Sequence, residues 1–206
     1  MISRGLKSVL CTAVLGVGIM NASPVLAKAT LPAQPAELID QKVIGDIRQW
    51  LANPVVAMSI ESQNKRRANM TQKQIDDADQ EWVREREAED QPLVAAVLTN
   101  PLSSYLTQIQ ARSGGLYSEI FVMDDKGLNV GQSSITSDFW QGDENKFQNT
   151  YPKGPDAVFI DQAEYNKDSD NWRAQVSMTM TGQDGAKIGA VTVEVNLTEL
   201  ARRKGM

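Results

Sequence analysis

The chain has 206 residues, a length that suits one domain of ordinary size. Its 21 basic and 26 acidic side chains give a net charge of -5, which argues against nucleic-acid binding by phosphate neutralisation. Histidine is absent and Cys11 is the only cysteine, which excludes the commonest general base and any disulfide within the chain. The composition therefore argues against an enzyme, and we expect no catalytic residue, no metal site and no cofactor.

Residues 1–27 have the pattern of a signal peptide. Arg4 and Lys7 precede an apolar run, and Pro24 followed by short side chains predicts cleavage after Ala27. The apolar run, Val9 to Met20, is shorter than the ~20 residues that a membrane-spanning helix needs. We therefore expect a soluble protein of the bacterial periplasm, and an uncleaved N-terminal anchor is the alternative.

Residues 36 to about 109 have the periodicity of helices. Apolar side chains recur near helical spacing at Leu38, Val43, Ile47 and Leu51. Pro54 suits the first turn of a second helix, and Pro101 precedes a helix that ends at Ser113-Gly114-Gly115. The first half of the chain therefore predicts several helices in succession.

A strongly charged stretch lies within this helical region. Thr71 with Gln74 three residues later is the capping-box pattern and predicts the start of a helix. Between Asp76 and Asp90, opposite charges recur at helical spacing. This pattern is typical of a solvated helix face, and the functional alternative is a docking face for a membrane-bound receptor.

After Gly115 the period of the apolar residues changes to two, which indicates strands. Strands are predicted over residues 117–123, 128–132, 157–164, 172–181 and 187–196. Asp124-Asp125-Lys126-Gly127 is a turn signal between the first two strands, and residues 137–148 are predicted to be helical with Ser137 as N-cap. Helices followed by an antiparallel five-stranded sheet make an α+β fold.

The acidic residues of two predicted turns also invite a calcium interpretation. Asp124 and Asp125 lie in one turn and Asp168 and Asp170 in another, and oxygen ligands in loops suit this cation. The first group lacks the spaced acids of a calcium loop and has Lys126 among its members. A turn signal is the simpler interpretation.

Three stretches after Gly115 carry a resemblance to a known family. The first strand ends in Met123-Asp124-Asp125-Lys126-Gly127, and the returning strand reads Leu128-Asn129-Val130-Gly131-Gln132-Ser133-Ser134. The most specific stretch, Thr136-Ser137-Asp138-Phe139-Trp140-Gln141-Gly142-Asp143-Glu144, follows this hairpin. With the order of the elements, these stretches resemble the Cache family of extracytoplasmic sensor domains, also described as PDC sensor domains. The resemblance covers roughly residues 36 to 200, and it implies a PAS-like core over 116–206 with the helical residues 28–115 packed on it.

The resemblance also implies a function. Domains of this family bind small molecules, often carboxylates or amines, between the sheet and its covering loops. They are usually tethered by transmembrane helices to histidine kinases, chemoreceptors or cyclic-dinucleotide enzymes. Because no second apolar segment of spanning length follows here, we expect an accessory to a membrane-bound receptor or kinase. A long N-terminal helix commonly mediates dimer contact in such domains; the stripe from Leu38 to Leu51 could supply this contact or pack on the protein's own sheet.

Nine of the 12 aromatic residues lie between Tyr117 and Trp172, where the resemblance implies a pocket. The candidate ligand-binding residues are Tyr117, Trp140, Asp143, Lys146, Tyr151 and Arg173. The Trp140 indole and the Tyr151 hydroxyl would orient a polar ligand. Arg173 or Lys146 would pair with a carboxylate, and Asp143 beside an aromatic wall would bind an ammonium group.

The alternative is that these aromatic side chains simply form the core and fill the pocket. The protein would then be a non-catalytic interaction or structural protein that docks a partner through its helical face.

Overall fold

The computed structural model describes residues 38–206, so the predicted signal peptide lies outside the described residues. Helices come first along this part of the chain: α2 (Gln41–Leu51), α3 (Pro54–Arg67), α4 (Gln72–Glu85), α5 (Pro92–Leu98) and α6 (Pro101–Arg112). Proline occupies the first turn of α3, α5 and α6, where the missing backbone N–H leaves no hydrogen bond unmade. The predicted capping box of Thr71 and Gln74 at the start of α4 is confirmed.

The second half of the chain forms an antiparallel sheet. Its strands are β1 (Tyr117–Met123), β2 (Asn129–Gln132), β3 (Val158–Ile160), β4 (Glu164–Asn166), β5 (Asn171–Thr181) and β6 (Lys187–Asn196). The strand order is β2-β1-β6-β5-β3, and β4 pairs with another part of β5. The first hairpin therefore lies beside the last strand, as in a PAS-like sheet. The predicted α+β fold is confirmed.

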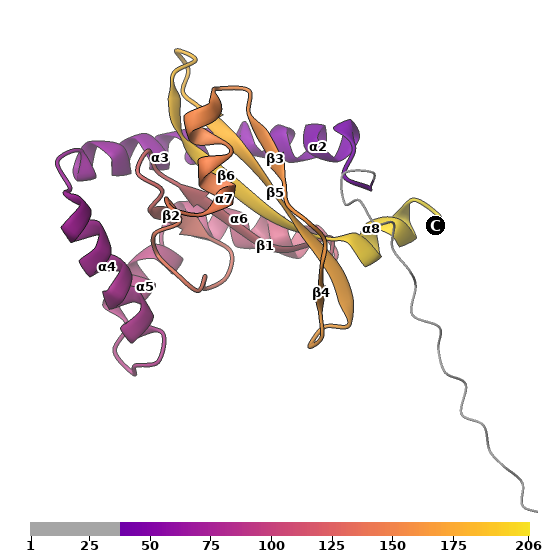
Figure 1. Ribbon diagram of the computed structural model, residues 1–206, viewed down its shortest axis with the longest axis horizontal. Helices are drawn as coiled ribbons and strands as arrows, with labels where there is room; N and C mark the ends of the chain where they lie inside the picture. Colours follow the sequence, from indigo (N-terminus) through magenta and orange to yellow (C-terminus); the bar gives the residue numbers. More distant parts are fainter. Residues whose placement is uncertain (1–37) are drawn as a thin grey trace, which may run out of the picture.

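The sheet has helices on both of its faces (Figure 1), with α7 (Asn145–Gln148) in front of it and α2 and α6 behind it. On the α2 and α6 side, Ile120 of β1 and Val193 of β6 pack with Leu106 of α6 in the main core. On the α7 side, Phe121 of β1 packs with Phe147 in a smaller cluster. Neighbouring residues of one strand thus belong to opposite faces, as the period of two predicts.

The helices α4 and α5 form an arm that lies beyond the β2 end of the sheet (Figure 1). The arm has its own apolar cluster, in which Trp82 of α4 and Val94 of α5 contact Leu128 and Phe139. Phe139 belongs to residues 133–144, which connect β2 to α7 and rest against the arm. The arm and this connection therefore depend on each other for burial.

The predicted helix over residues 137–148 is wrong except for its last turn, because only Asn145–Gln148 is helical. The backbone N–H groups of Phe139 and Trp140 donate to Asp79 Oδ1 of α4, each at 2.8 Å. The Asn129 N–H donates to the Phe139 carbonyl at 3.0 Å. These bonds to distant residues replace the bonds that a helix would make.

Two further elements differ from the prediction. The expected strand over residues 157–164 ends at Ile160, and the chain then forms the additional strand β4. A C-terminal helix, α8 (Leu197–Arg203), follows β6, and the Asn196 side chain caps it by accepting a hydrogen bond from the Glu199 N–H. The sheet thus has six strands, one more than predicted.

We expect the substitution Gly189→Ala to destabilise the protein by about 1–3 kcal/mol through overpacking. A Cβ atom at Gly189 in β6 would lie 2.1 Å from the Met123 carbonyl oxygen of β1. Urea unfolding measures the loss. The matched control is Gly45→Ala in α2, where no atom lies within 4 Å of the new Cβ, so helix propensity should add about 0.5–1 kcal/mol. Wild-type stability for Gly189→Ala would contradict the close approach of β1 and β6.

Candidate functional site

A polar cavity of about 500 Å³ lies between α7 and the sheet. Its lining comes from α7 and the residues before it, from the connection between β3 and β4, and from β4, β5 and β6. The residues are Asp143, Glu144, Asn145, Lys146, Asp161, Gln162, Glu164, Arg173, Ala174, Gln175 and Glu194. Its position between the sheet and a covering helix is where the sequence resemblance implies a ligand site.

The charges in this cavity are mostly negative. Five carboxylates, from Asp143, Glu144, Asp161, Glu164 and Glu194, accompany the two cations Lys146 and Arg173. Both cations already have carboxylate partners. Arg173 Nη1 donates to Glu194 Oε1 at 2.8 Å, and Lys146 Nζ lies 2.8 Å from Glu144 Oε2. The ion pairs within residues 38–206 include no partner for Asp143, Asp161 or Glu164. The cavity therefore has unpaired negative charge.

Arg173 is held firmly in its position. Its Nε donates to Asn171 Oδ1 at 2.9 Å and its Nη2 to Ser169 Oγ at 2.7 Å, in addition to the bond with Glu194. In the antiparallel register, Arg173 of β5 lies opposite Asn196 of β6, two residues from Glu194. The Arg173 guanidinium is therefore fixed in the cavity wall by hydrogen bonds to three neighbouring side chains.

A second carboxylate lies beside Glu194 on the same part of the sheet. Glu119 of β1 is the antiparallel partner of Glu194 of β6, so the two side chains are neighbours. Burial, together with the Glu194 carboxylate, raises the pKa of Glu119 to about 7. The Ser134 hydroxyl donates to Glu119 Oε1 at 3.4 Å. A carboxyl group with a raised pKa, that of Glu119, thus lies beside Glu194, which lines the polar cavity.

The structure brings together three of the six predicted ligand-binding residues. Asp143, Lys146 and Arg173 line one cavity, although they come from separate parts of the chain. Tyr117 is buried in the main core on the other face of the sheet, with its ring 6.1 Å from that of Trp50.

The other two aromatic candidates also lie outside this cavity. The Trp140 Nε1 donates to the Lys126 carbonyl at 2.8 Å, and the Tyr151 ring stacks on Phe147 at 5.3 Å. The cavity lining contains no aromatic residue, so the expected aromatic wall beside Asp143 is not found there.

The sequence interpretation missed Asp161 and Glu194 as lining residues and Glu119 as their neighbour. A signal for two of them was present. Glu119 and Glu194 each occur in a strand whose other residues are mostly apolar, and a charged side chain in such a strand usually has a partner. Asp161 has no comparable signal, since it follows a short strand and resembles any loop acid.

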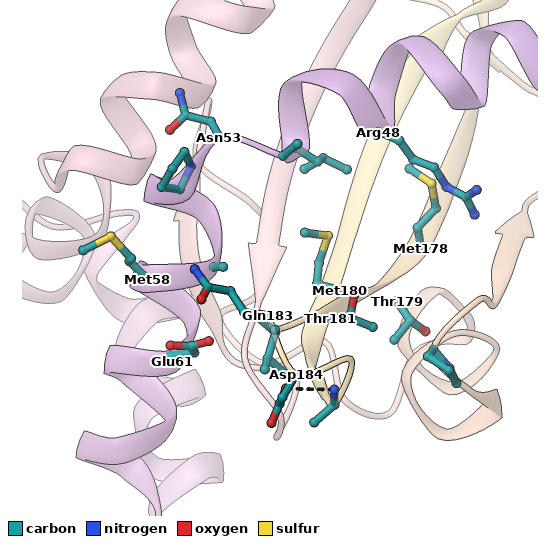
Figure 2. A pocket seen from close by; sticks show the side chains of 18 of the residues that line it. Arg48, Asn53, Met58, Glu61, Met178, Thr179, Met180, Thr181, Gln183 and Asp184 are labelled. Atoms are coloured by element: carbon teal, nitrogen blue, oxygen red, sulfur yellow. Dashed lines mark hydrogen bonds between the residues drawn. The ribbon is translucent and has the colours of Figure 1, made fainter.

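A larger groove of about 980 Å³ lies on the other side of the molecule, between the α2–α3 corner and the turn that joins β5 to β6. Figure 2 shows the Met180 and Gln183 side chains between α3 and this hairpin, whereas Met58 points away from the hairpin. The groove is lined by both signs of charge, from Arg48 and from the acids Glu61, Asp156 and Asp184. Its mixed lining gives it no single ligand chemistry.

The described residues contain neither a metal-binding cluster nor a membrane-spanning helix. Within residues 38–206, no three acidic or cysteine side chains are grouped so that they could hold a metal ion. Asp124, a candidate calcium ligand, is buried, and its Oδ1 accepts hydrogen bonds from the Lys126 and Leu128 N–H groups at 2.9 Å. The same part of the chain includes no helix with the length and apolarity to span a bilayer.

Comparisons with known proteins give structural matches only. No protein-family model and no curated protein sequence matches the chain. An extracellular domain attributed to a histidine kinase, rpHK1S-Z16, matches with a TM-score of 0.42 and 16% identity over 52% of this chain and 44% of that chain. The sensory domain of the Campylobacter jejuni chemoreceptor Tlp3 matches with a TM-score of 0.39 and 14% identity, over 81% of this chain and 60% of that chain.

The E. coli DcuS sensor domain has a TM-score of 0.39 and 10% identity, over 72% of this chain and 99% of that chain. The chain spans 44% and 60% of the lengths of the first two proteins. At these TM-scores the likenesses carry no argument about ligand or function. The three matches are sensor or extracellular domains, the class of protein that the sequence resembles.

Proposed function

We propose that this protein is a periplasmic sensor module that binds a small molecule with an ammonium group, an amine or an amino acid, between α7 and the sheet. The observation that carries the proposal is the charge of the cavity. Five carboxylates line it, and its two cations are already paired with two of them. A ligand with an ammonium group would neutralise the remaining negative charge.

The ion pairs also decide between ligand classes. A simple carboxylate would have to displace Glu194 from Arg173 or Glu144 from Lys146, at the cost of a charge-assisted hydrogen bond. An amine meets Asp143 and Asp161, whose carboxylates have no ion pair in residues 38–206. An amino acid would bring its ammonium group to these acids, which would offset the displacement of Glu194 or Glu144 by its carboxylate. The cavity therefore favours amines and amino acids over organic acids.

A thermal-shift screen of the purified protein against amines, amino acids and dicarboxylates tests this proposal. A ligand at about 100 times its Kd should stabilise the protein by about 2.7 kcal/mol. We expect a hit among the amines or amino acids, and Asp161→Asn should weaken its binding by about tenfold, as loss of a charged hydrogen-bond partner does. Asp90→Asn, an exposed acid outside the cavity, is the matched control and should bind as the wild type does. A hit confined to dicarboxylates would contradict the proposal.

We also propose that the module is an accessory to a membrane-bound receptor or kinase. This part of the proposal rests on the sequence resemblance to Cache domains. The charged run Asp76 to Asp90 is the expected contact, with side chains such as Asp77 and Arg84 on α4 exposed to solvent. Crosslinking from α4 in living cells should capture an inner-membrane signalling protein in a ligand-dependent manner. A crosslinking yield that is the same with and without the ligand would contradict the accessory role.

A second candidate function is that of an interaction protein without a small ligand. One observation favours it: the larger groove lies beside α2 and α3, and the Met58 side chain at its edge is 66% exposed. The same screen distinguishes the two candidates. A cooperatively folded protein that responds to no small molecule would support docking of a partner through the helical face.

A further inference from the structure

A third cavity, of about 640 Å³, lies at the base of the α4–α5 arm, apart from the polar cavity under α7. It is formed by α3, α5, the start of α6 and one residue of β2, elements that Figure 1 shows together at the β2 end of the sheet. Its lining residues are Val55, Met58, Ser59, Ser62, Gln63, Arg66, Arg67, Leu93, Ala96, Val97, Asn100, Pro101 and Val130. None of them lines the polar cavity under α7.

The charge of this third cavity is opposite to that of the rest of the protein. Its lining includes two arginines, Arg66 and Arg67, and no aspartate or glutamate. The whole chain has a net charge of -5, so a cavity with cations alone is a local exception. An anion could pair with an arginine in this cavity, whereas both cations of the polar cavity under α7 are already paired with carboxylates.

Most of the remaining wall is apolar. Val55 of α3, Leu93 and Val97 of α5 and Val130 of β2 contribute aliphatic surface from separate elements. Met58 is an exposed methionine at the edge of this cavity, and a flexible thioether adapts to apolar groups of different shape. An apolar body would therefore be enclosed from several sides.

Arg67 is a cation without a direct counter-charge. Its Nη1 is buried and has no hydrogen-bond partner in residues 38–206, and none of the ion pairs in that part of the chain includes it. The guanidinium lies over the Phe139 ring, 4.9 Å from its centroid. Burial lowers the pKa of Arg67 from its usual value, although arginine remains charged at neutral pH.

Asp124, the acid that acts on Arg67 electrostatically, already accepts hydrogen bonds from other groups. Asp124 is buried, and its carboxylate accepts hydrogen bonds from Gln63 Nε2 and from the Lys126 and Leu128 N–H groups, each at 2.9 Å. It forms no ion pair with Arg67 within 4.0 Å. Arg67 is half-buried, and its Nη1 is a buried donor without an acceptor in residues 38–206, which is rare in folded proteins.

We propose that this cavity binds an amphipathic organic anion, a medium-chain monocarboxylate, with the carboxylate on Arg67 and the alkyl chain against α3 and α5. Arg66, exposed at the cavity edge with its Nη1 bonded to Ser62 Oγ at 2.5 Å, adds positive charge near the same end. A small inorganic anion would satisfy Arg67 and leave the aliphatic wall in contact with water. A fatty amine would place a cation beside two arginines.

Calorimetric titration of the purified protein with octanoate tests the proposal. We expect saturable binding of one octanoate, no comparable binding of acetate, which lacks the chain, and none of octylamine, which has the opposite charge. Arg67→Met should weaken octanoate binding by about tenfold or more, because it removes a charge-assisted hydrogen bond and keeps an unbranched apolar side chain. Lys65→Met is the matched control on the same helix, since Lys65 is exposed and does not line the cavity.

A second variant keeps the proposal testable if Arg67→Met does not fold. Ala96 is exposed and lines the cavity, so Ala96→Phe should place a ring against its apolar wall without removing a buried side chain, and should weaken octanoate binding strongly. Absence of octanoate binding in the wild type, equal binding in Ala96→Phe, or equal binding of octylamine would each overturn the proposal. The proposal does not depend on the polar cavity, since Asp161→Asn should bind octanoate as the wild type does.

Discussion

Replacing Trp82 with alanine is expected to destabilise the protein by about 3–5 kcal/mol, the usual cost of removing a fully buried large aromatic side chain. Trp82 is 0% exposed, and its ring stacks on that of Phe139 with centroids 5.3 Å apart and an interplanar angle of 18°. Its Nε1 donates to the Thr136 carbonyl at 3.0 Å. The substitution therefore leaves a cavity and an unpaired carbonyl where the arm meets residues 133–144. Denaturant unfolding followed by circular dichroism measures the change.

Two comparisons show whether the loss has this cause. Trp82→Phe keeps an aromatic ring and loses the hydrogen bond, so it should cost less than Trp82→Ala. Val83→Ala, one residue further along α4 at a side chain that is 44% exposed, should change stability by about 0.5 kcal/mol or less. A loss below about 1 kcal/mol in Trp82→Ala would mean that the arm contributes little to the cooperative unit.

The elements that the sequence predicts well are those whose signals are local. Pro54 and Pro101 begin helices, and Thr71 and Gln74 form the predicted capping box, in which the Thr71 N–H donates to Gln74 Oε1 at 2.9 Å. The alternation from Tyr117 to Met123 is a strand with those same bounds. In each case the residues that determine the local structure lie within a few positions of one another in the sequence.

The prediction fails where a partner from far along the chain decides the structure. Residues 137–144 carry a plausible helix start at Ser137, yet Asp79 of α4 takes the backbone N–H groups of Phe139 and Trp140. No pattern within residues 137–148 indicates that Asp79 accepts these hydrogen bonds. The helix α8 is a different kind of failure, because its N-cap, Asn196 with Glu199 three residues later, is a local signal.

The candidate site divides in the same way. The composition of the segment around α7 suggested Asp143 and Lys146, and the structure places both in the polar cavity. The pairing of Arg173 with Glu194 depends on the register between β5 and β6, which a single sequence does not specify. This ion pair moves the expected ligand from a carboxylate towards an ammonium group. The sequence therefore predicted which charged residues line the cavity in the case of Asp143, Lys146 and Arg173, but not that Arg173 and Lys146 are already paired with carboxylates.

The stability of the protein should fall as the pH rises from about 4.5 to about 7, because of Glu119. Burial and the Glu194 carboxylate raise the pKa of Glu119 from 4.5 to about 7 in the folded state. Between these two values the folded state holds a proton that the unfolded state has released, so unfolding becomes easier as the pH rises. A difference of this size corresponds to about 3 kcal/mol, fully lost once the pH exceeds the folded-state pKa.

The substitution Glu119→Gln isolates this contribution. An uncharged amide at the same position cannot ionise, so the variant should be more stable than the wild type by about 2–3 kcal/mol at pH 8 and close to it at pH 4.5. Glu87→Gln, an exposed acid on the arm, is the matched control and should keep the pH dependence of the wild type. Urea unfolding at a series of pH values measures both. A wild-type profile that rises from pH 4.5 to 7, with the same slope in Glu119→Gln, would show that Glu119 ionises freely and that the Glu119–Glu194 pair is not a source of strain.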